Sequence, residues 1–213
     1  MTEIARISTP LSEAWPSWLM LGLLVCFVLS EVLQPETLRA AFRTTFTKME
    51  RIYGDRARNL YGVILLNLFR IGTFAMALYA FTYHSAPFSL RTYGIIIGVV
   101  LAVLTVRAAV SWLVAYTFEL QRTVVIYLPQ YDNLWTMLCV LLYPAILLCI
   151  NFSGEAFHWL AIAIGALFVG VMIFKIVQYF YAGPQSVLYL LIYVVTLELL
   201  PLGAIIVTTQ SLT

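Results

Sequence analysis

The sequence predicts an all-α fold: a polytopic bundle of about six transmembrane helices with one amphipathic helix on the cytoplasmic surface. Hydrophobic residues make up 62% of the 213 residues and charged residues only 10%, which is far more apolar than a soluble globular domain. The hydrophobic residues also stand in continuous runs, and a helix needs about 20 of them to cross a bilayer. We therefore expect residues 1–213 to form a single integral membrane domain.

The first two predicted spans are residues 15–33 and 59–83. Trp15 and Trp18 begin the first span, at the level where tryptophan side chains sit at the membrane–water interface. The polar segment of residues 34–58 separates this span from the second one. The remaining predicted spans are 92–118, 134–150, 158–180 and 185–208.

The segment between the first two spans, residues 34–58, holds six of the twelve basic residues. Apolar residues recur within it at spacings of three or four, which predicts an amphipathic helix over about residues 36–53 lying along the membrane surface. Its basic side chains would rest on anionic lipids of the inner leaflet or on an acidic surface of a partner. These basic residues are Arg39, Arg43, Lys48 and Arg51.

Small residues and prolines mark the later spans. Gly94, Gly98 and Ala102 recur every four positions in the third span and offer a face on which two helices can approach closely. Residues 119–133 are expected to be a connecting segment, with Asp132 as the cap of the fourth span. Pro144 should kink the fourth span, and Pro201 should kink the sixth.

Basic residues favour one side of the predicted membrane. The segment 34–58, Arg122 and the end of the fifth span carrying Lys175 all fall on the same side, while the other side has Arg6 and Arg91. The positive-inside rule makes the richer side cytoplasmic. Both termini are then predicted to be extracytoplasmic.

Charged residues within the apolar runs are the candidate site. Arg70 lies about eleven residues, or roughly 16 Å, into the second span, and Glu198 lies at a similar depth in the sixth. Arg107, Lys175 and Glu31 lie nearer the cytoplasmic face. One hypothesis makes the Arg70–Glu198 pair structural; the other makes Arg70, Arg107 and Lys175 a site for an anionic group, with Glu198 as counter-ion or proton site.

Catalytic machinery is not visible in the sequence. It contains no nucleophile elbow, phosphate loop or HExxH motif, and His84 and His158 have no third metal ligand near them at a typical spacing. We expect neither a metal, a cofactor nor a nucleic-acid partner, and predict that the protein is not an enzyme. The net charge of +2 is also too small to indicate nucleic-acid binding.

The last third of the chain resembles a known family. Lys175 precedes the final span, and that span contains Thr196-Leu197-Glu198-Leu199-Leu200-Pro201. This pattern is similar to the ending of a family of small inner-membrane proteins of Bacteroidota that is catalogued only as a domain of unknown function. The resemblance implies a bacterial inner membrane and an envelope process such as type IX secretion, gliding or envelope biogenesis.

Two functions are compatible with these observations. The first is a non-enzymatic subunit or assembly factor of a cell-envelope complex, which contacts other membrane proteins through its transmembrane helices. The alternative is a small transporter or flippase for an anionic lipid or a coupled ion, using Arg70, Glu198, Arg107 and Lys175.

Overall fold

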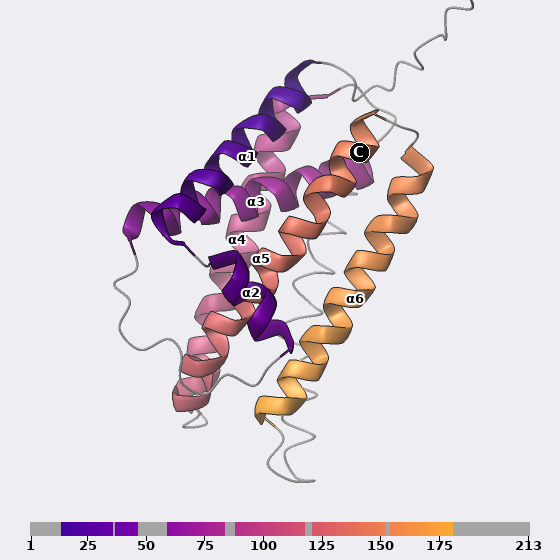
Figure 1. Ribbon diagram of the computed structural model, residues 1–213. Coiled ribbons are helices and arrows are strands. Elements are labelled where there is room, and N and C mark those ends of the chain that lie inside the picture. The colour runs from indigo at the N-terminus through magenta and orange to yellow at the C-terminus, as the bar shows by residue number, and fades with distance from the viewer. Residues whose placement is uncertain are drawn as a thin grey trace, which may run out of the picture.

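The computed structural model describes residues 14–35, 37–46, 59–83, 88–117, 121–151 and 154–180. These residues form six α-helices and no strand, as the all-α prediction requires. The helices, shown in Figure 1, are α1 (Ala14–Leu33), α2 (Thr37–Phe46), α3 (Leu60–Thr82), α4 (Leu90–Thr117), α5 (Gln121–Asn151) and α6 (Gly154–Phe180).

Four of the described helices are long and apolar enough to cross a membrane. The qualifying stretches are Trp15–Leu33, Leu60–Thr82, Leu90–Val110 and Tyr131–Leu148. α6 adds a shorter apolar stretch, Trp159–Phe174. The described part of the chain is therefore that of a helical membrane protein. The predicted sixth span, 185–208, lies outside the described residues.

The predicted connection over residues 119–133 is wrong for most of its length. α5 begins at Gln121 and continues to Asn151, so Asp132 lies inside a helix and does not cap one. Pro129 and Pro144 both lie within α5. A proline removes one backbone hydrogen bond, but neighbouring helices can compensate for that loss in a membrane bundle. The predicted kink at Pro144 stays a prediction.

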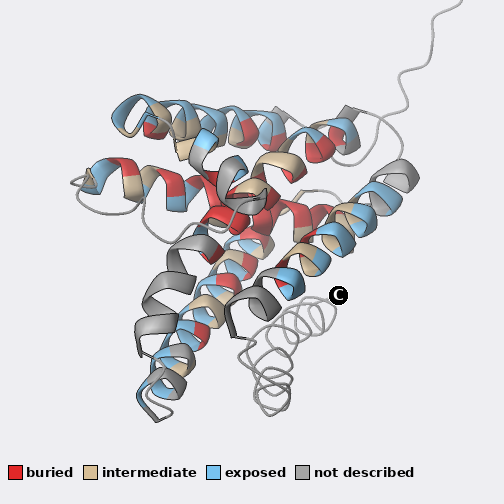
Figure 2. Ribbon diagram, turned by 60° about the horizontal axis from the view of Figure 1, so that its bottom comes forward, coloured by how far each residue is buried: buried red, intermediate tan, exposed pale blue. Residues whose placement is uncertain are grey.

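α3 is the central helix of the arrangement. It contacts α1, α4 and α5, and its buried residues continue around most of its circumference in the second half. α1 and α3 lie side by side across the more upright α4, α5 and α6 (Figure 1). The buried residues, red in Figure 2, concentrate at the centre of the molecule, while the outward faces of α1 and α6 are mostly exposed.

Glycine allows α1 and α3 to approach closely. A Cβ atom built on Gly72 of α3 would lie 2.5 Å from Leu23 Cδ2 of α1, well inside van der Waals contact. The rings of Phe27 and Phe69 meet in the same interface with their centroids 4.7 Å apart. Because atoms cannot pack at 2.5 Å, any side chain at position 72 must push α1 away or displace Leu23.

We expect Gly72→Val to destabilise the protein by about 1–3 kcal/mol, the usual cost of overpacking a tight interface. The thermal unfolding midpoint in mild detergent measures this loss. Adding Leu23→Ala should recover part of it, because the smaller side chain vacates the space that the introduced valine needs. Gly22→Ala is the matched control: Gly22 is exposed on α1 with no described atom within 4 Å of its Cβ position, so the midpoint should not fall. A midpoint unchanged by Gly72→Val would contradict the close contact.

Candidate functional site

Polar side chains form a row on α3 that leads from the exposed Asn67 to the buried Arg70 and Thr73. Asn67, Arg70 and Thr73 are spaced by three residues, which places them on one side of the helix. Arg70 is only 8% exposed, and its Nη1 donates a hydrogen bond to Asn67 Oδ1 at 3.2 Å. This local bond compensates part of the cost of removing the guanidinium group from water.

Thr73 completes this row on α3 and is completely buried. Its Oγ1 has no hydrogen-bond partner among the described residues. Thr82, Thr105 and Thr136 behave differently, because each donates its hydroxyl to the carbonyl four residues earlier. The Thr73 hydroxyl therefore does not follow the pattern of these other helical threonines.

A second row of polar residues lies on α5, the helix that packs against α3. Asn133, Thr136 and Cys139 repeat the spacing of three and are all buried. Cys139 Sγ donates to the backbone carbonyl of Arg70 at 3.4 Å, which joins the two rows. We call these six residues the α3–α5 polar seam: Asn67, Arg70, Thr73, Asn133, Thr136 and Cys139.

Aromatic side chains close the space beside the seam. Phe74 of α3 contacts Trp135 of α5, with ring centroids 4.5 Å apart. Trp135 also contacts Tyr131, at 6.3 Å, and Phe168 of α6, at 6.1 Å. These rings exclude water from the bundle, and a low local dielectric strengthens the electrostatic interactions of the polar groups beside them.

Arg107 of α4 has a different environment from Arg70. It is 7% exposed, and its guanidinium carbon lies 3.3 Å above the centre of the Tyr131 ring of α5. Such a cation–π contact stabilises a desolvated guanidinium group by about 2 kcal/mol or more. Arg107 therefore joins α4 to α5. It lies within the bundle, whereas a residue that faces the membrane lipids would be exposed.

The other predicted charges are not brought together by the described contacts. Glu31 lies at the end of α1, where its carboxylate accepts hydrogen bonds from the backbone N–H of Leu38 in α2. It thus caps α2 from α1, while its place among the charges near the cytoplasmic face stays a prediction. Lys175 lies in the last part of α6, although its side chain is outside the described set, and Glu198 and Pro201 lie outside the described residues.

The segment predicted to form a surface helix is helical in its described part. α2 covers residues 37–46 of the predicted 36–53, and it packs against α5. Arg39 is exposed, Arg43 lies on α2 with its side chain outside the described set, and Lys48 and Arg51 lie outside the described residues. The contact with α5 means that the protein itself positions α2, and its place at the membrane surface stays a prediction.

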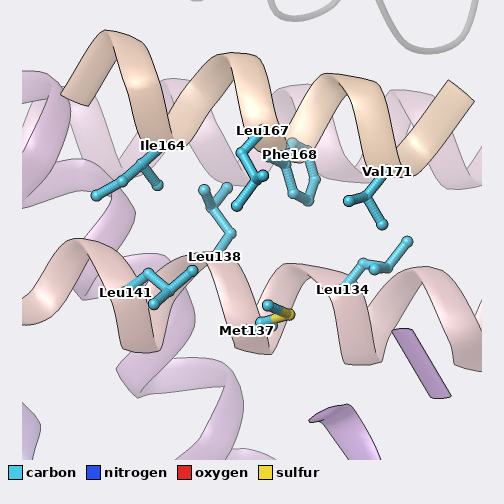
Figure 3. A pocket seen from close by; sticks show the side chains of 8 residues that line it. All are labelled: Leu134, Met137, Leu138, Leu141, Ile164, Leu167, Phe168 and Val171. Atoms are coloured by element: carbon cyan, nitrogen blue, oxygen red, sulfur yellow. The ribbon is translucent and has the colours of Figure 1, made fainter. Parts of the chain in front are cut away.

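A small pocket lies between α5 and α6, within the apolar part of both helices (Figure 3). Its volume is about 20 Å³, room for about one water-sized molecule. All eight lining residues are apolar, so the pocket offers a ligand no hydrogen bond. They are Leu134, Met137, Leu138, Leu141, Ile164, Leu167, Phe168 and Val171. Within the described ranges, no three His, Cys, Asp or Glu residues gather to hold a metal ion.

Sequence reasoning identified Arg70 and Arg107 but missed the residues that surround them. The spacing of Asn67, Arg70 and Thr73 within an apolar run was a signal that the whole row lies on one side of a helix. Of the α5 row, Asn133 fell in the predicted connection 119–133, whereas Thr136 and Cys139 fell in the predicted fourth span and were not recognised as part of a polar row. Nothing in the sequence indicated that Tyr131 contacts Arg107, since an aromatic residue at the end of a span is usually an interfacial anchor.

The fold and the seam define a helical membrane protein with a polar seam inside an apolar bundle. Comparison with protein families assigns it further: a model of a domain of unknown function (DUF4271) matches residues 17–208, so the chain belongs to this family. No curated protein and no solved structure matches the chain.

Replacing the two charged residues by leucine tests whether Arg70 pairs with Glu198, as the sequence predicts. Arg70→Leu and Glu198→Leu should each lower the amount of folded protein, because removing one partner of a buried pair costs about 3–5 kcal/mol. The double variant should recover most of this loss. Fluorescence-detected size-exclusion chromatography measures the folded fraction. Losses that simply add in the double variant would show that the two groups do not interact.

A double-mutant cycle tests the Arg107–Tyr131 contact. Arg107→Met, Tyr131→Leu and their combination should give a coupling free energy of about 1 kcal/mol or more, since the cycle removes contributions that each residue makes elsewhere. Thermal midpoints in detergent provide the values. Tyr116→Leu replaces the Tyr131 change in a control cycle, because Tyr116 is 75% exposed and should show no coupling with Arg107. Coupling equal to that of the control would contradict the contact.

Proposed function

We propose that the protein is a non-enzymatic subunit or assembly factor of a membrane-bound cell-envelope complex, and that it acts through helix contacts within the membrane. The observation that supports this most directly is the outward face of α4. Its small residues follow one another at spacings of four, four, three and four, and all are exposed. They are Gly94, Gly98, Ala102, Thr105 and Ala109.

This outward face differs from that of α1 in the same molecule. The exposed side of α1 carries large aliphatic residues, including Leu21, Val25 and Val28. Lipid tails pack readily against such side chains, so they fit a lipid-facing surface. A face of small residues instead gains most from a second helix, whose backbone can then come close.

The protein's own packing supports this use of glycine. A Cβ atom on Gly62 would lie 2.8 Å from an atom of Gln34, in the turn that follows α1. A Cβ atom on Gly72 would lie 2.5 Å from an atom of Leu23 in α1. At Gly94 and Gly98, no described atom lies within 4 Å of the Cβ position. Glycines on α3 therefore allow a close contact within the chain, whereas the glycines on α4 meet no described atom. We propose that a helix of a partner membrane protein binds at these α4 glycines.

The proposed setting is a bacterial inner membrane with both chain termini in the periplasm. The concentration of basic residues in 34–58 supports this orientation. The resemblance of the segment from Lys175 to Pro201 to Bacteroidota proteins supports an envelope process of that phylum, such as type IX secretion, gliding or envelope biogenesis. Anionic lipids of the inner leaflet would contact Arg39 and the other basic residues near it.

A second candidate is a small transporter or flippase for an anionic lipid or a coupled ion. The two buried guanidinium groups, Arg70 and Arg107, favour it, because intramembrane charges often belong to transport sites. The α5–α6 pocket does not add to this case, since it is apolar and far too small for a lipid headgroup. We therefore rank transport second.

Substituting the α4 face tests the leading proposal. The tagged protein is extracted from its own membranes in mild detergent, and proteins and lipids that accompany it are identified by mass spectrometry. We expect a stoichiometric membrane-protein partner. Gly94→Ile combined with Gly98→Ile should reduce its recovery at least about tenfold, a loss of about 1.4 kcal/mol, without lowering the thermal midpoint.

Gly22→Ile is the matched control, since Gly22 is also an exposed helical glycine with no described atom within 4 Å of its Cβ position. This variant should keep the partner. Recovery of the partner by the α4 double variant would contradict the proposal. Recovery of the wild-type protein alone with a tightly held anionic lipid would favour the transporter.

A further inference from the structure

The hydroxyl group of Thr73 is enclosed in the bundle but makes no bond to its own helix. The side chain is completely buried, and its Oγ1 has no hydrogen-bond partner among the described residues. A threonine within a helix can donate to the carbonyl four residues earlier, as Thr136 does on α5 at 2.8 Å. Thr73 leaves this acceptor unused. Since a buried hydroxyl without a partner is unfavourable, its place in the bundle needs an explanation.

Two acceptors of the α3–α5 polar seam lie beside this hydroxyl. Arg70 precedes Thr73 by three residues, so the Thr73 side chain lies next to the Arg70 carbonyl on the same side of α3. Cys139 Sγ donates to this carbonyl at 3.4 Å and comes from α5. The carbonyl oxygen can accept a second bond, and the sulfur of a thiol is itself a weak acceptor. A donor and two acceptors from two helices therefore meet at one point.

The α3 row also leads from the surface of the protein to this point. Exposure falls from Asn67, which is exposed, through Arg70 to the completely buried Thr73. Charged side chains within membrane helices face the bundle interior or a water-filled space, because lipid tails offer them no hydrogen bond. Polar groups along such a row give water a path inward. The α5–α6 pocket has room for a water molecule but only apolar lining, so it does not offer water a comparable site.

We propose that one water molecule binds between α3 and α5 at Thr73. The water accepts a hydrogen bond from Thr73 Oγ1 and donates to the Arg70 carbonyl and to Cys139 Sγ. A buried water makes about three hydrogen bonds, and these groups supply that number. A bridging water is nearly as favourable in enthalpy as a direct hydrogen bond, so it satisfies the hydroxyl and adds to the joint between the two helices. This site does not depend on the α4 face or on a partner protein.

X-ray hydroxyl-radical footprinting with mass spectrometry, on the full chain in lipid nanodiscs, tests for this water. The radicals form from water itself, so a buried side chain is oxidised where a water molecule lies beside it. Met76 is the reporter, because it is completely buried and lies one turn after Thr73 on the same side of α3. Met76 should be oxidised faster than Met172 of α6, which is equally buried. Thr73→Val should abolish this excess, and Thr73→Ser, which keeps the hydroxyl, should retain it.

The thermal unfolding midpoint gives a second measurement on the same variants. Thr73→Val should lower the midpoint by about 2–4 °C, the shift that the loss of one ordinary hydrogen bond causes in a chain of this length. Thr136→Val is the matched control, since Thr136 is equally buried but its hydroxyl bonds a carbonyl that its own helix already satisfies. The control should not lower the midpoint.

Three results would overturn the proposal. An unchanged or raised midpoint in Thr73→Val would show that the hydroxyl is buried without a partner. Equal oxidation of Met76 and Met172 in the wild-type protein would show that no water lies at this point. A Met76 excess that persists in Thr73→Val would place the water elsewhere in the bundle.

Discussion

A guanidinium group inside an apolar bundle must find its partners within the protein, because lipid tails offer none. This constraint accounts for much of the interior described here. Arg70 is bonded to Asn67 one turn earlier, and its carbonyl accepts from Cys139. Arg107 stacks on Tyr131. The guanidinium group of Arg107 thereby joins α4 to α5, whereas α3 is joined to α5 through the backbone carbonyl of Arg70.

The arrangement also depends on the close contact between α3 and α1, which requires glycine at position 72. Arg70 and Gly72 are two residues apart on α3, so the helix carries its buried cation on one side and its closest contact with α1 on another. Tyr93 of α4 also donates to the carbonyl of Gly72 at 3.1 Å. α3 is therefore contacted by three helices within a single turn. A bulky residue at position 72 would disturb all of these contacts, whereas one at Gly94 or Gly98 meets no described atom.

Hydrophobic runs were sufficient to predict three of the helices that are long and apolar enough to cross a membrane: α1, α3 and α4 begin and end within about two residues of the predicted spans. The start of α5 could not be found in this way, since residues 121–130 mix polar and apolar side chains and contain Pro129, which usually marks a boundary. Arg70 and Arg107 were identifiable because a charge in an apolar run is rare. The capping role of Glu31 was not predicted, because a helix cap supplied by a different helix leaves no local pattern.

The stability of the described helices should be graded, and the grading follows from what each one buries. α3 is enclosed by aromatic, glycine and hydrogen-bonded contacts from α1, α4 and α5, so it can open only if the bundle opens. α4 is fixed on its inner side by Arg107 and Tyr93, which leaves its outer face free to bind without disturbing the core. α2 is held at its start by the Glu31 carboxylate and along its length by its packing against α5. A partner bound to α4 would thus meet a surface that is fixed to the core.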